Sequence, residues 1–239
     1  FTGRLRTTAE SHNRIFVMEV MGRDAGWLTG SAIFGGSDIA LIPEIEMTKD
    51  RKDRFFQTIE KAYKDSPTKS LIIPVSEGVR WYDEEKQKLD VVYASAEVDE
   101  YGHPRFGGIS GKIASEINSK LGIDARAQIS GYYPRAGTCR KYDRKLTLTL
   151  ADKIVDLLLR EDYGKMPVMS KIVPYLEVEE FHAKAIDMGN VGNQPLQKDY
   201  YDEDNFSFTE AYRDLLTMIV RRLRFKEFLP EMKKVVPNK

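Results

Sequence analysis

The chain has 239 residues, of which 41% are hydrophobic and 10% aromatic, so it can bury a core and is not intrinsically disordered. Its 37 Lys and Arg residues balance 37 Asp and Glu residues, which disfavours a generic nucleic-acid or membrane-surface binder. A single cysteine, Cys139, excludes an internal disulfide framework and a cysteine-rich zinc site. No apolar run has the length of a membrane span and no signal peptide opens the sequence, so we expect a cytoplasmic protein.

The first two thirds of the chain alternate apolar runs with helical patterns. Short runs rich in β-branched residues predict strands at 14–20, 39–42, 70–75 and 124–130. Helical spacing of apolar or small residues predicts helices at about 24–34, 51–64, 109–121 and 140–160. Strands and helices that alternate in this way predict an α/β fold, in which helices flank a parallel sheet on both faces.

Two regions depart from this alternation. Residues 79–105 are charged and carry turn signals, so we expect an inserted strand or hairpin there. From about residue 165 the composition changes, and an amphipathic helical pattern follows at 208–223. We therefore predict an α/β domain at 1–165 and a C-terminal extension at 166–239 that packs on the same domain.

The residues directly after the predicted strands are the candidates for a binding site, because open parallel sheets bind ligands at the carboxyl ends of their strands. Residues 21–23 follow the first strand, Glu77 follows the third, and residues 131–135 follow the fourth. These segments supply arginines that can pair with phosphate, glycines that let a ligand approach the backbone, and a carboxylate that can accept from hydroxyls. The mixture favours a phosphorylated sugar; the alternative is that the arginines are ordinary surface charges.

Several of these segments resemble the sugar-binding half of the 6-phosphofructokinases. The resemblance begins in residues 14–26, RIFVMEVMGRDAG, and continues in Pro43-Glu44 and in residues 74–78. The run from Arg126 to Arg135, followed by Tyr142-Asp143-Arg144, is similar to the phosphate-binding run of the family. The resemblance covers about residues 4–165 in collinear order and implies a Rossmann-like domain.

The resemblance also implies roles for the matched residues. Met21 and Gly22 would line the fructose 6-phosphate site, and Arg23 would be catalytic, facing the phosphoryl group in transit. Glu77 would bind hydroxyls of the sugar.

Four further residues are implied to hold the sugar phosphate. Tyr132 and Arg135 would bind the 6-phosphate from the same subunit. Arg14 and Arg126 begin their strands, and therefore lie at the opposite end of the sheet in their own subunit. They match arginines that reach into a neighbouring subunit's site, which implies a homo-oligomer, a dimer or a tetramer.

The implied reaction moves a phosphoryl group from pyrophosphate or ATP, with Mg²⁺, to the 1-hydroxyl of fructose 6-phosphate in glycolysis. Residues 99–103 and Gly107-Gly108 resemble the pyrophosphate-dependent branch, and this favours pyrophosphate as the donor. Tyr132 and Pro134 stand where the ATP-using bacterial enzymes usually have His and Gln.

Two family motifs do not occur in the sequence: the Gly-Gly-Asp donor loop and the Thr-x-Asp-Asn-Asp segment with the catalytic base. Both belong upstream of Arg4 in the family, so we expect the donor-binding portion to be absent from this chain and the chain alone to be inactive. His12, His103 and His182 are far apart, so we expect no metal site from them, and the residues that bind the donor stay unknown. The alternative is a non-catalytic regulatory domain that binds a sugar phosphate or a nucleotide.

Overall fold

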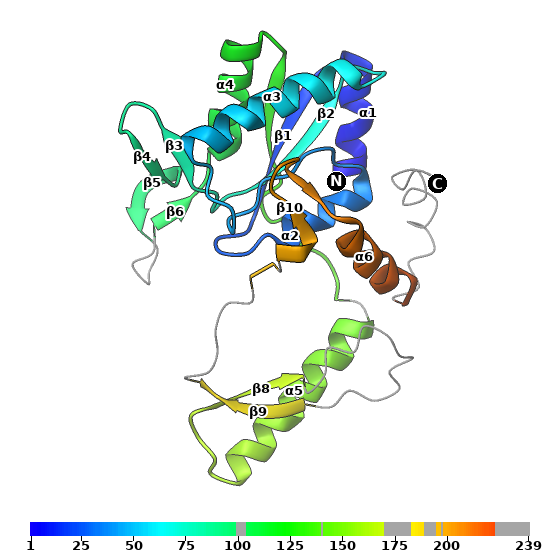
Figure 1. Cartoon of the computed structure of the whole chain (residues 1–239). Coiled ribbons are helices and arrows are strands. Elements are labelled where there is room, and N and C mark those ends of the chain that lie inside the picture. Colours follow the sequence, from blue (N-terminus) through cyan, green and yellow to red (C-terminus); the bar gives the residue numbers. More distant parts are fainter. Residues whose placement is uncertain (99–103, 140, 170–182, 189–194, 197, 223–239) are drawn as a thin grey trace. The chain divides into compact units, whose positions relative to one another are not determined.

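The computed structural model describes residues 1–98, 104–139, 141–169, 183–188, 195–196 and 198–222 (Figure 1). Its α-helices are α1 (Thr2–His12), α2 (Trp27–Gly30), α3 (Lys49–Asp65), α4 (Ile109–Leu121), α5 (Lys141–Leu159) and α6 (Glu210–Arg222). Its 3-10 helices are η1 (Ser31–Gly35), η2 (Tyr133–Arg135) and η4 (Lys198–Tyr200). Its strands are β1 (Ile15–Val20), β2 (Leu71–Ser76), β3 (Trp81–Asp83), β4 (Lys88–Asp90), β5 (Tyr93–Val98), β6 (Pro104–Phe106), β7 (Ala125–Ile129), β8 (Lys165–Met169), β9 (Ala183–Asp187), β10 (Tyr201–Asp202) and β11 (Ser207–Phe208).

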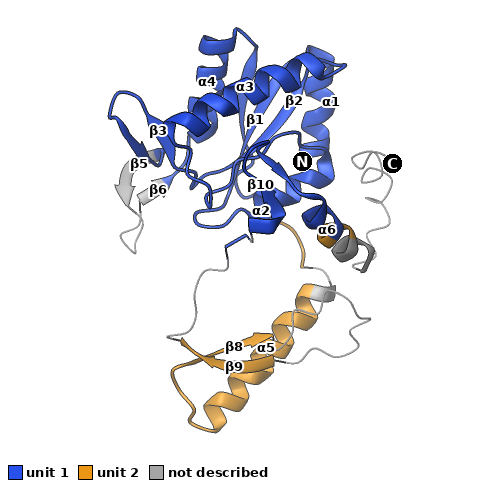
Figure 2. Cartoon of the chain, viewed as in Figure 1, with its two compact units in different colours: residues 1–135, 194–214, 230–239 blue, residues 136–193, 215–229 orange. Residues whose placement is uncertain are grey.

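The chain forms two compact units (Figure 2). The first comprises residues 1–135, 194–214 and 230–239, and the second comprises residues 136–193 and 215–229. The first unit contains the central sheet and all the segments that follow its strands. The predicted division into an α/β domain at 1–165 and an extension at 166–239 that packs on it stays a prediction.

The central sheet has the strand order β2-β1-β7, and both pairs of strands are parallel. All six residues of β1 are buried, which agrees with the apolar run that predicted this strand. Residues alternate between the two faces of a strand, so each face needs its own cover. The expected α/β fold, a parallel sheet flanked by helices, is confirmed.

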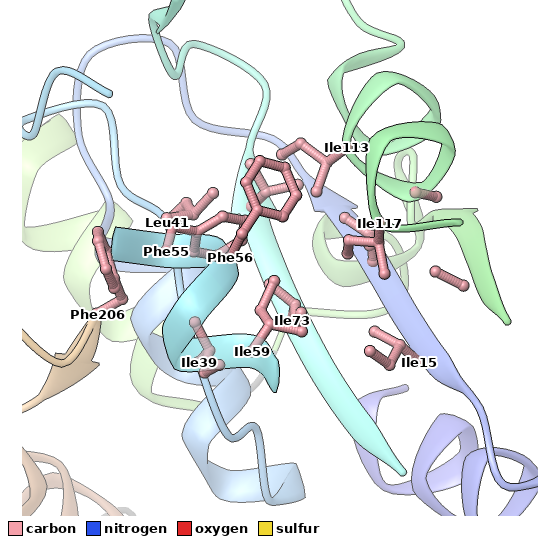
Figure 3. Packing of buried hydrophobic residues seen from close by; sticks show 14 of the residues in the cluster. Ile15, Ile39, Leu41, Phe55, Phe56, Ile59, Ile73, Ile113, Ile117 and Phe206 are labelled. Atoms are coloured by element: carbon pink, nitrogen blue, oxygen red, sulfur yellow. The ribbon is translucent and has the colours of Figure 1, made fainter. Parts of the chain in front are cut away.

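Helices α3 and α4 cover one face of the sheet and form the main core (Figure 3). Phe55 and Ile59 of α3, together with Ile113 of α4, are fully buried in the cluster that contains Ile15 and Ile73 of the sheet. Burying a side chain of this size stabilises the fold by about 1.5–3 kcal/mol. The predicted helices at 51–64 and 109–121 are therefore confirmed, with ends shifted by at most two residues.

Helix α1 covers the opposite face. Ala9 of this helix is buried in a cluster with Phe16 of β1 and Ile72 of β2. Met18 and Val20 on the same face pack with Ala32 of η1. The sheet therefore has helical cover on both faces.

The predicted strand at 39–42 is wrong, because this segment makes only one bridge to the sheet, between Leu41 and Val75. The Leu41 N–H donates to the Pro74 carbonyl at 2.9 Å, whereas the Ala40 N–H donates to Phe206 at 2.8 Å. The segment thus divides its hydrogen bonds between β2 and a distant part of the chain. Pro43 then removes the next donor that a strand would need.

The predicted helix at 24–34 is shorter than expected and changes type. It consists of α2 and η1, and η1 ends at Gly35 before Gly36, which has a left-handed φ of 79°. Residues 24–26 instead form the connection that leaves β1.

The inserted region forms two antiparallel hairpins, β3-β4 and β5-β6. Tyr93 at the start of β5 pairs with Phe106 at the end of β6. Residues 99–103 lie outside the described part of the chain. Both hairpins belong to the unit that contains the sheet.

The later part of the chain contributes to both units. In the second unit, β8 and β9 form an antiparallel hairpin that contacts α5. In the first unit, Tyr212 of α6 is buried against Gly30. The two are so close that a Cβ added to Gly30 would lie 2.2 Å from the hydroxyl oxygen of Tyr212. No helix among the described residues is long and apolar enough to cross a membrane.

Candidate functional site

Three polar segments meet at the carboxyl edge of the central sheet. Residues 21–23 follow β1, Glu77 follows β2, and residues 131–135 follow β7. Because β1 lies between the other two strands and all three are parallel, the three segments leave the sheet side by side. A direct contact joins two of them, since the Gly22 N–H donates to Oε1 of Glu77 at 3.3 Å.

The backbones of the first two segments continue the pairing beyond the strands. The Glu77 N–H donates to the Val20 carbonyl at 2.9 Å, and the Gly78 N–H donates to the Gly22 carbonyl at 3.0 Å. A Cβ on Gly78 would lie 1.8 Å from the backbone oxygen of Arg23, so only glycine fits there. This close approach fixes the backbone of Arg23 beside Glu77.

Opposing influences act on the charge of Glu77. Burial, together with the nearby charge of Glu19, raises the pKa of Glu77 above its ordinary value. The hydrogen bond from Gly22 and the charges of Arg23 and Arg135 act in the opposite direction but do not cancel the effect of burial. The carboxylate therefore lies within the electrostatic reach of both arginines.

The third segment turns sharply where β7 ends. Both the N–H and the hydroxyl of Ser130 donate to the Glu19 carbonyl, at 3.0 and 2.7 Å. Gly131 then adopts a left-handed φ of 52° and starts the turn into η2. Tyr132 and Arg135 are exposed here, and the Arg135 guanidinium carbon lies 5.3 Å from the centroid of the Tyr132 ring. An exposed guanidinium on a turn at the sheet edge can meet an anionic ligand.

A buried carboxylate beneath this edge was not singled out from the sequence. Glu19 of β1 is only 5% exposed, and it accepts hydrogen bonds from the N–H groups of Gly108 and Ser110 and from the Ser110 hydroxyl. It thereby caps the amino end of α4, where backbone donors and the helix dipole favour a negative charge. A charged residue within an apolar strand was the available signal.

Phe106 is a second neighbour of the site that the sequence did not indicate. The guanidinium carbon of Arg23 lies 4.7 Å from the centroid of its ring. Both residues border a crevice of about 740 Å³ that is also lined by Gly78 and Tyr93. Because Phe106 lies 83 residues after Arg23 in the sequence, no local pattern could reveal their contact.

Arg14 and Arg126 do not join the other candidates. Their Nε atoms lie 3.4 and 2.9 Å from the carboxylate of Asp124, at the amino edge of the sheet. Since β1 rises about 3.3 Å per residue, roughly 20 Å of strand separates this edge from Arg23. That Arg14 and Arg126 bind the sugar phosphate in the site of a neighbouring subunit stays a prediction.

The described residues do not offer a metal site. No three His, Cys, Asp or Glu side chains among them come together as ligands would. His12 contacts Ser11 and the Thr8 carbonyl, and Cys139 is an exposed free thiol, while His103 and His182 lie outside the described residues. Mg²⁺ therefore has no assigned ligands among the described residues.

Comparisons with known proteins relate this chain to one family. A family model described as phosphofructokinase matches residues 1–158. The chain is 37% identical over 165 residues to a pyrophosphate–fructose 6-phosphate 1-phosphotransferase of Amycolatopsis mediterranei, with 68% of this chain and 45% of the relative covered. It is 39% identical over 149 residues to an ATP-dependent 6-phosphofructokinase of Corynebacterium efficiens, with 60% and 39% covered.

A solved structure shares the fold. The pyrophosphate-dependent phosphofructokinase from Nitrosospira multiformis superposes with a TM-score of 0.67 at 22% sequence identity. The superposition covers 91% of this chain and 52% of that one. The chain therefore matches less than half the length of the two curated relatives and about half of this structure.

Proposed function

The chain belongs to the phosphofructokinase family, as its motifs predicted, and from this premise we propose that it forms the acceptor side of a phosphotransferase. The sugar would be fructose 6-phosphate, and the product would carry a second phosphoryl group on its 1-hydroxyl. The relatives named above use either pyrophosphate or ATP according to their names, and pyrophosphate is the donor to test first. The parent protein would be a cytoplasmic homo-oligomer in glycolysis.

The observation that carries this proposal is the meeting of one carboxylate and two arginines at the sheet edge. Glu77 follows β2 and contacts Gly22, while Arg23 and Arg135 follow the neighbouring strands β1 and β7, although the three residues are far apart in the sequence. Glu77 can accept hydrogen bonds from sugar hydroxyls, while an arginine can pair with phosphate oxygens through two donors. A sugar phosphate needs both kinds of group within one small site.

The roles follow from the chemistry of each group. Arg135, stacked beside Tyr132, would hold the 6-phosphate, and Glu77 would orient the sugar through its hydroxyls. Met21 and Gly22 would form the wall along the sugar. Arg23 would stabilise the negative charge on the phosphoryl group as it moves between oxygens. Interactions that are stronger in the transition state than in the bound substrate accelerate a reaction.

Part of the reaction needs groups outside this set. Phosphoryl transfer requires an aligned donor and a base that takes the proton of the attacking hydroxyl. Neither the Gly-Gly-Asp motif nor the Thr-x-Asp-Asn-Asp motif occurs in the sequence, so the residues assigned here serve the acceptor alone. The second candidate, a regulatory domain that binds a sugar phosphate without catalysis, has the same acceptor site.

Calorimetric titration of the chain with fructose 6-phosphate tests the proposal. We expect saturable binding that weakens about 10- to 150-fold in Arg135→Ala, because a hydrogen bond to a charged group contributes about 1.5–3 kcal/mol. Arg54→Ala is the matched control, since Arg54 of α3 forms an exposed ion pair with Asp204. Its affinity should equal that of the unmodified chain.

Two outcomes would overturn the assignment. Equal affinities for Arg135→Ala and Arg54→Ala would remove Arg135 from the site. A folded oligomeric chain that does not bind fructose 6-phosphate would remove the acceptor role from this set of residues. Activity of a full-length parent protein, measured with pyrophosphate and with ATP in parallel, separates the enzyme from the regulatory alternative and identifies the donor.

A further inference from the structure

An aromatic ring lies against the guanidinium of Arg23. The ring belongs to Phe106, the last residue of β6, and its centroid is 4.7 Å from the guanidinium carbon. Arg23 comes from the loop after β1, whereas Phe106 comes from the base of the β5-β6 hairpin. The inserted region therefore reaches the residue that the proposed function makes catalytic.

Phe106 is held through its ring and through the backbone that follows it. Tyr93, its partner in the hairpin, packs edge-on against the ring with 5.8 Å between ring centroids. In the next two residues, the Gly107 N–H donates to the Val92 carbonyl at 3.1 Å, and the Gly108 N–H donates to both carboxylate oxygens of Glu19 at 3.0 Å. Since Glu19 is a residue of β1, the base of the hairpin is tied to the strand that also carries Arg23.

An aromatic ring is suited to orient a phosphate-binding arginine. It attracts the cation through its electron-rich face, and the N–H donors of a guanidinium point outward in the guanidinium plane. Because the ring is uncharged, it adds no negative charge beside the guanidinium.

We propose that Phe106 is a positioning residue that holds the Arg23 guanidinium where the phosphoryl group on C1 of the sugar arrives. The inference rests on the proposed function, because it takes the role of Arg23 from there. The 6-phosphate lies at the other end of the sugar, where Arg135 stacks with Tyr132 at 5.3 Å. The two arginine–aromatic pairs thus serve different ends of one ligand, which makes their roles separable.

The test compares two ligands, fructose 6-phosphate and fructose 1,6-bisphosphate, in calorimetric titrations of the full 239-residue chain. Phe106→Leu keeps an apolar side chain and removes the ring, while Phe106→Tyr keeps the ring. We expect Phe106→Leu to weaken the bisphosphate about three- to tenfold, as a lost cation–π contact would, and to leave fructose 6-phosphate unchanged. Phe106→Tyr should bind both ligands with the affinities of the unmodified chain.

Tyr132→Leu is the matched control, because it removes the other ring of the site. It should weaken both ligands by the same factor, since both carry the 6-phosphate. The NMR shift of the Arg23 Nε–H group gives a readout that does not need a ligand: we expect the ring-current shift in the unmodified chain and in Phe106→Tyr, and its loss in Phe106→Leu.

The results separate the inference from the proposed function. If fructose 6-phosphate binds and Phe106→Leu leaves the preference for the bisphosphate unchanged, the positioning role is wrong and the acceptor site stands. The same conclusion follows if Phe106→Leu weakens both ligands equally. If the unmodified chain binds neither ligand, the proposed function fails and the inference fails with it.

Discussion

The N–H of Gly22 donates to Oε1 of Glu77 at 3.3 Å, and this contact joins the segments that follow two neighbouring parallel strands. It places the half-buried carboxylate of Glu77 directly beside the backbone that carries Arg23. Burial raises the pKa of Glu77, and the hydrogen bond only partly opposes this effect. Under the proposed function, the protonation state of Glu77 would therefore link the binding of the sugar to pH.

Fructose 6-phosphate should bind more weakly as the pH falls through the raised pKa of Glu77. A carboxylate accepts hydrogen bonds from sugar hydroxyls with both oxygens, and protonation removes part of this capacity. The phosphate of the ligand also titrates, near pH 6, so its effect on affinity must be separated from that of Glu77. Glu77→Gln serves this purpose, because its affinity can change only with the titration of the ligand. We expect Glu77→Gln to bind more weakly at pH 7 and to lack the additional loss of affinity that protonation of Glu77 causes in the unmodified chain. Identical pH profiles in calorimetry would contradict a role for Glu77.

The same substitution should stabilise the fold at neutral pH. A carboxyl group with a raised pKa in the folded state contributes stability below its ordinary pKa of 4.5, and this contribution is lost as the pH rises through the folded value. At pH 7 the folded chain therefore holds an unfavourable charge that Glu77→Gln removes. We expect Glu77→Gln to have a higher Tm than the unmodified chain at pH 7 and no advantage at pH 4. The exposed Glu60→Gln on α3 is the control, and an unchanged Tm for both variants at pH 7 would refute the argument.

The parts of the fold that the sequence predicted are those in which local composition and tertiary environment agree. The apolar run of β1 predicted a strand because a strand between two layers of helices must be apolar on both faces. Residues 39–42 are also apolar, yet they make a single bridge to β2 at Leu41, and the Ala40 N–H donates to the Phe206 carbonyl. That partner lies 166 residues away in the sequence, where no local pattern can reveal it.

The site shows the same division. That Arg23, Glu77 and Arg135 lie at one edge of the sheet was predictable, because each follows a strand and the ends of parallel strands meet at one edge; their roles stay predictions. Glu19 and Phe106 were not predictable, because their importance comes from what they contact. Glu19 matters through the amino end of α4, and Phe106 matters through Arg23.

Gly78→Ala should destabilise the chain and disturb the site together. A Cβ at this position would lie 1.8 Å from the Arg23 backbone oxygen, so the end of β1 or the end of β2 must shift. Overpacking of this kind costs about 1–3 kcal/mol. Gly111→Ala is the control, because Gly111 lies on α4 with nothing within 4 Å of the added Cβ, and it should stabilise the chain by about 0.5–1 kcal/mol. Urea unfolding measures both, and similar free energies of unfolding for the two variants would refute the close approach.

Arg126→Ala should weaken the binding of fructose 6-phosphate only in samples that are oligomeric. Arg126 and Arg14 share Asp124 at the amino edge of the sheet, so within their own subunit they cannot reach the edge where Arg23 lies. Any contribution to the sugar phosphate must therefore cross a subunit interface. The loss of one charge-assisted contact corresponds to a roughly tenfold change in affinity.

Sedimentation and calorimetry on the same samples decide this prediction. In an oligomeric sample, Arg126→Ala should bind about tenfold more weakly than the Arg54→Ala control. In a sample diluted until it is monomeric, the two variants should have equal affinities, and the unmodified chain should bind as weakly as they do. Full affinity in a strictly monomeric sample would show that the site is complete without a partner, and both arginines would then act only through Asp124.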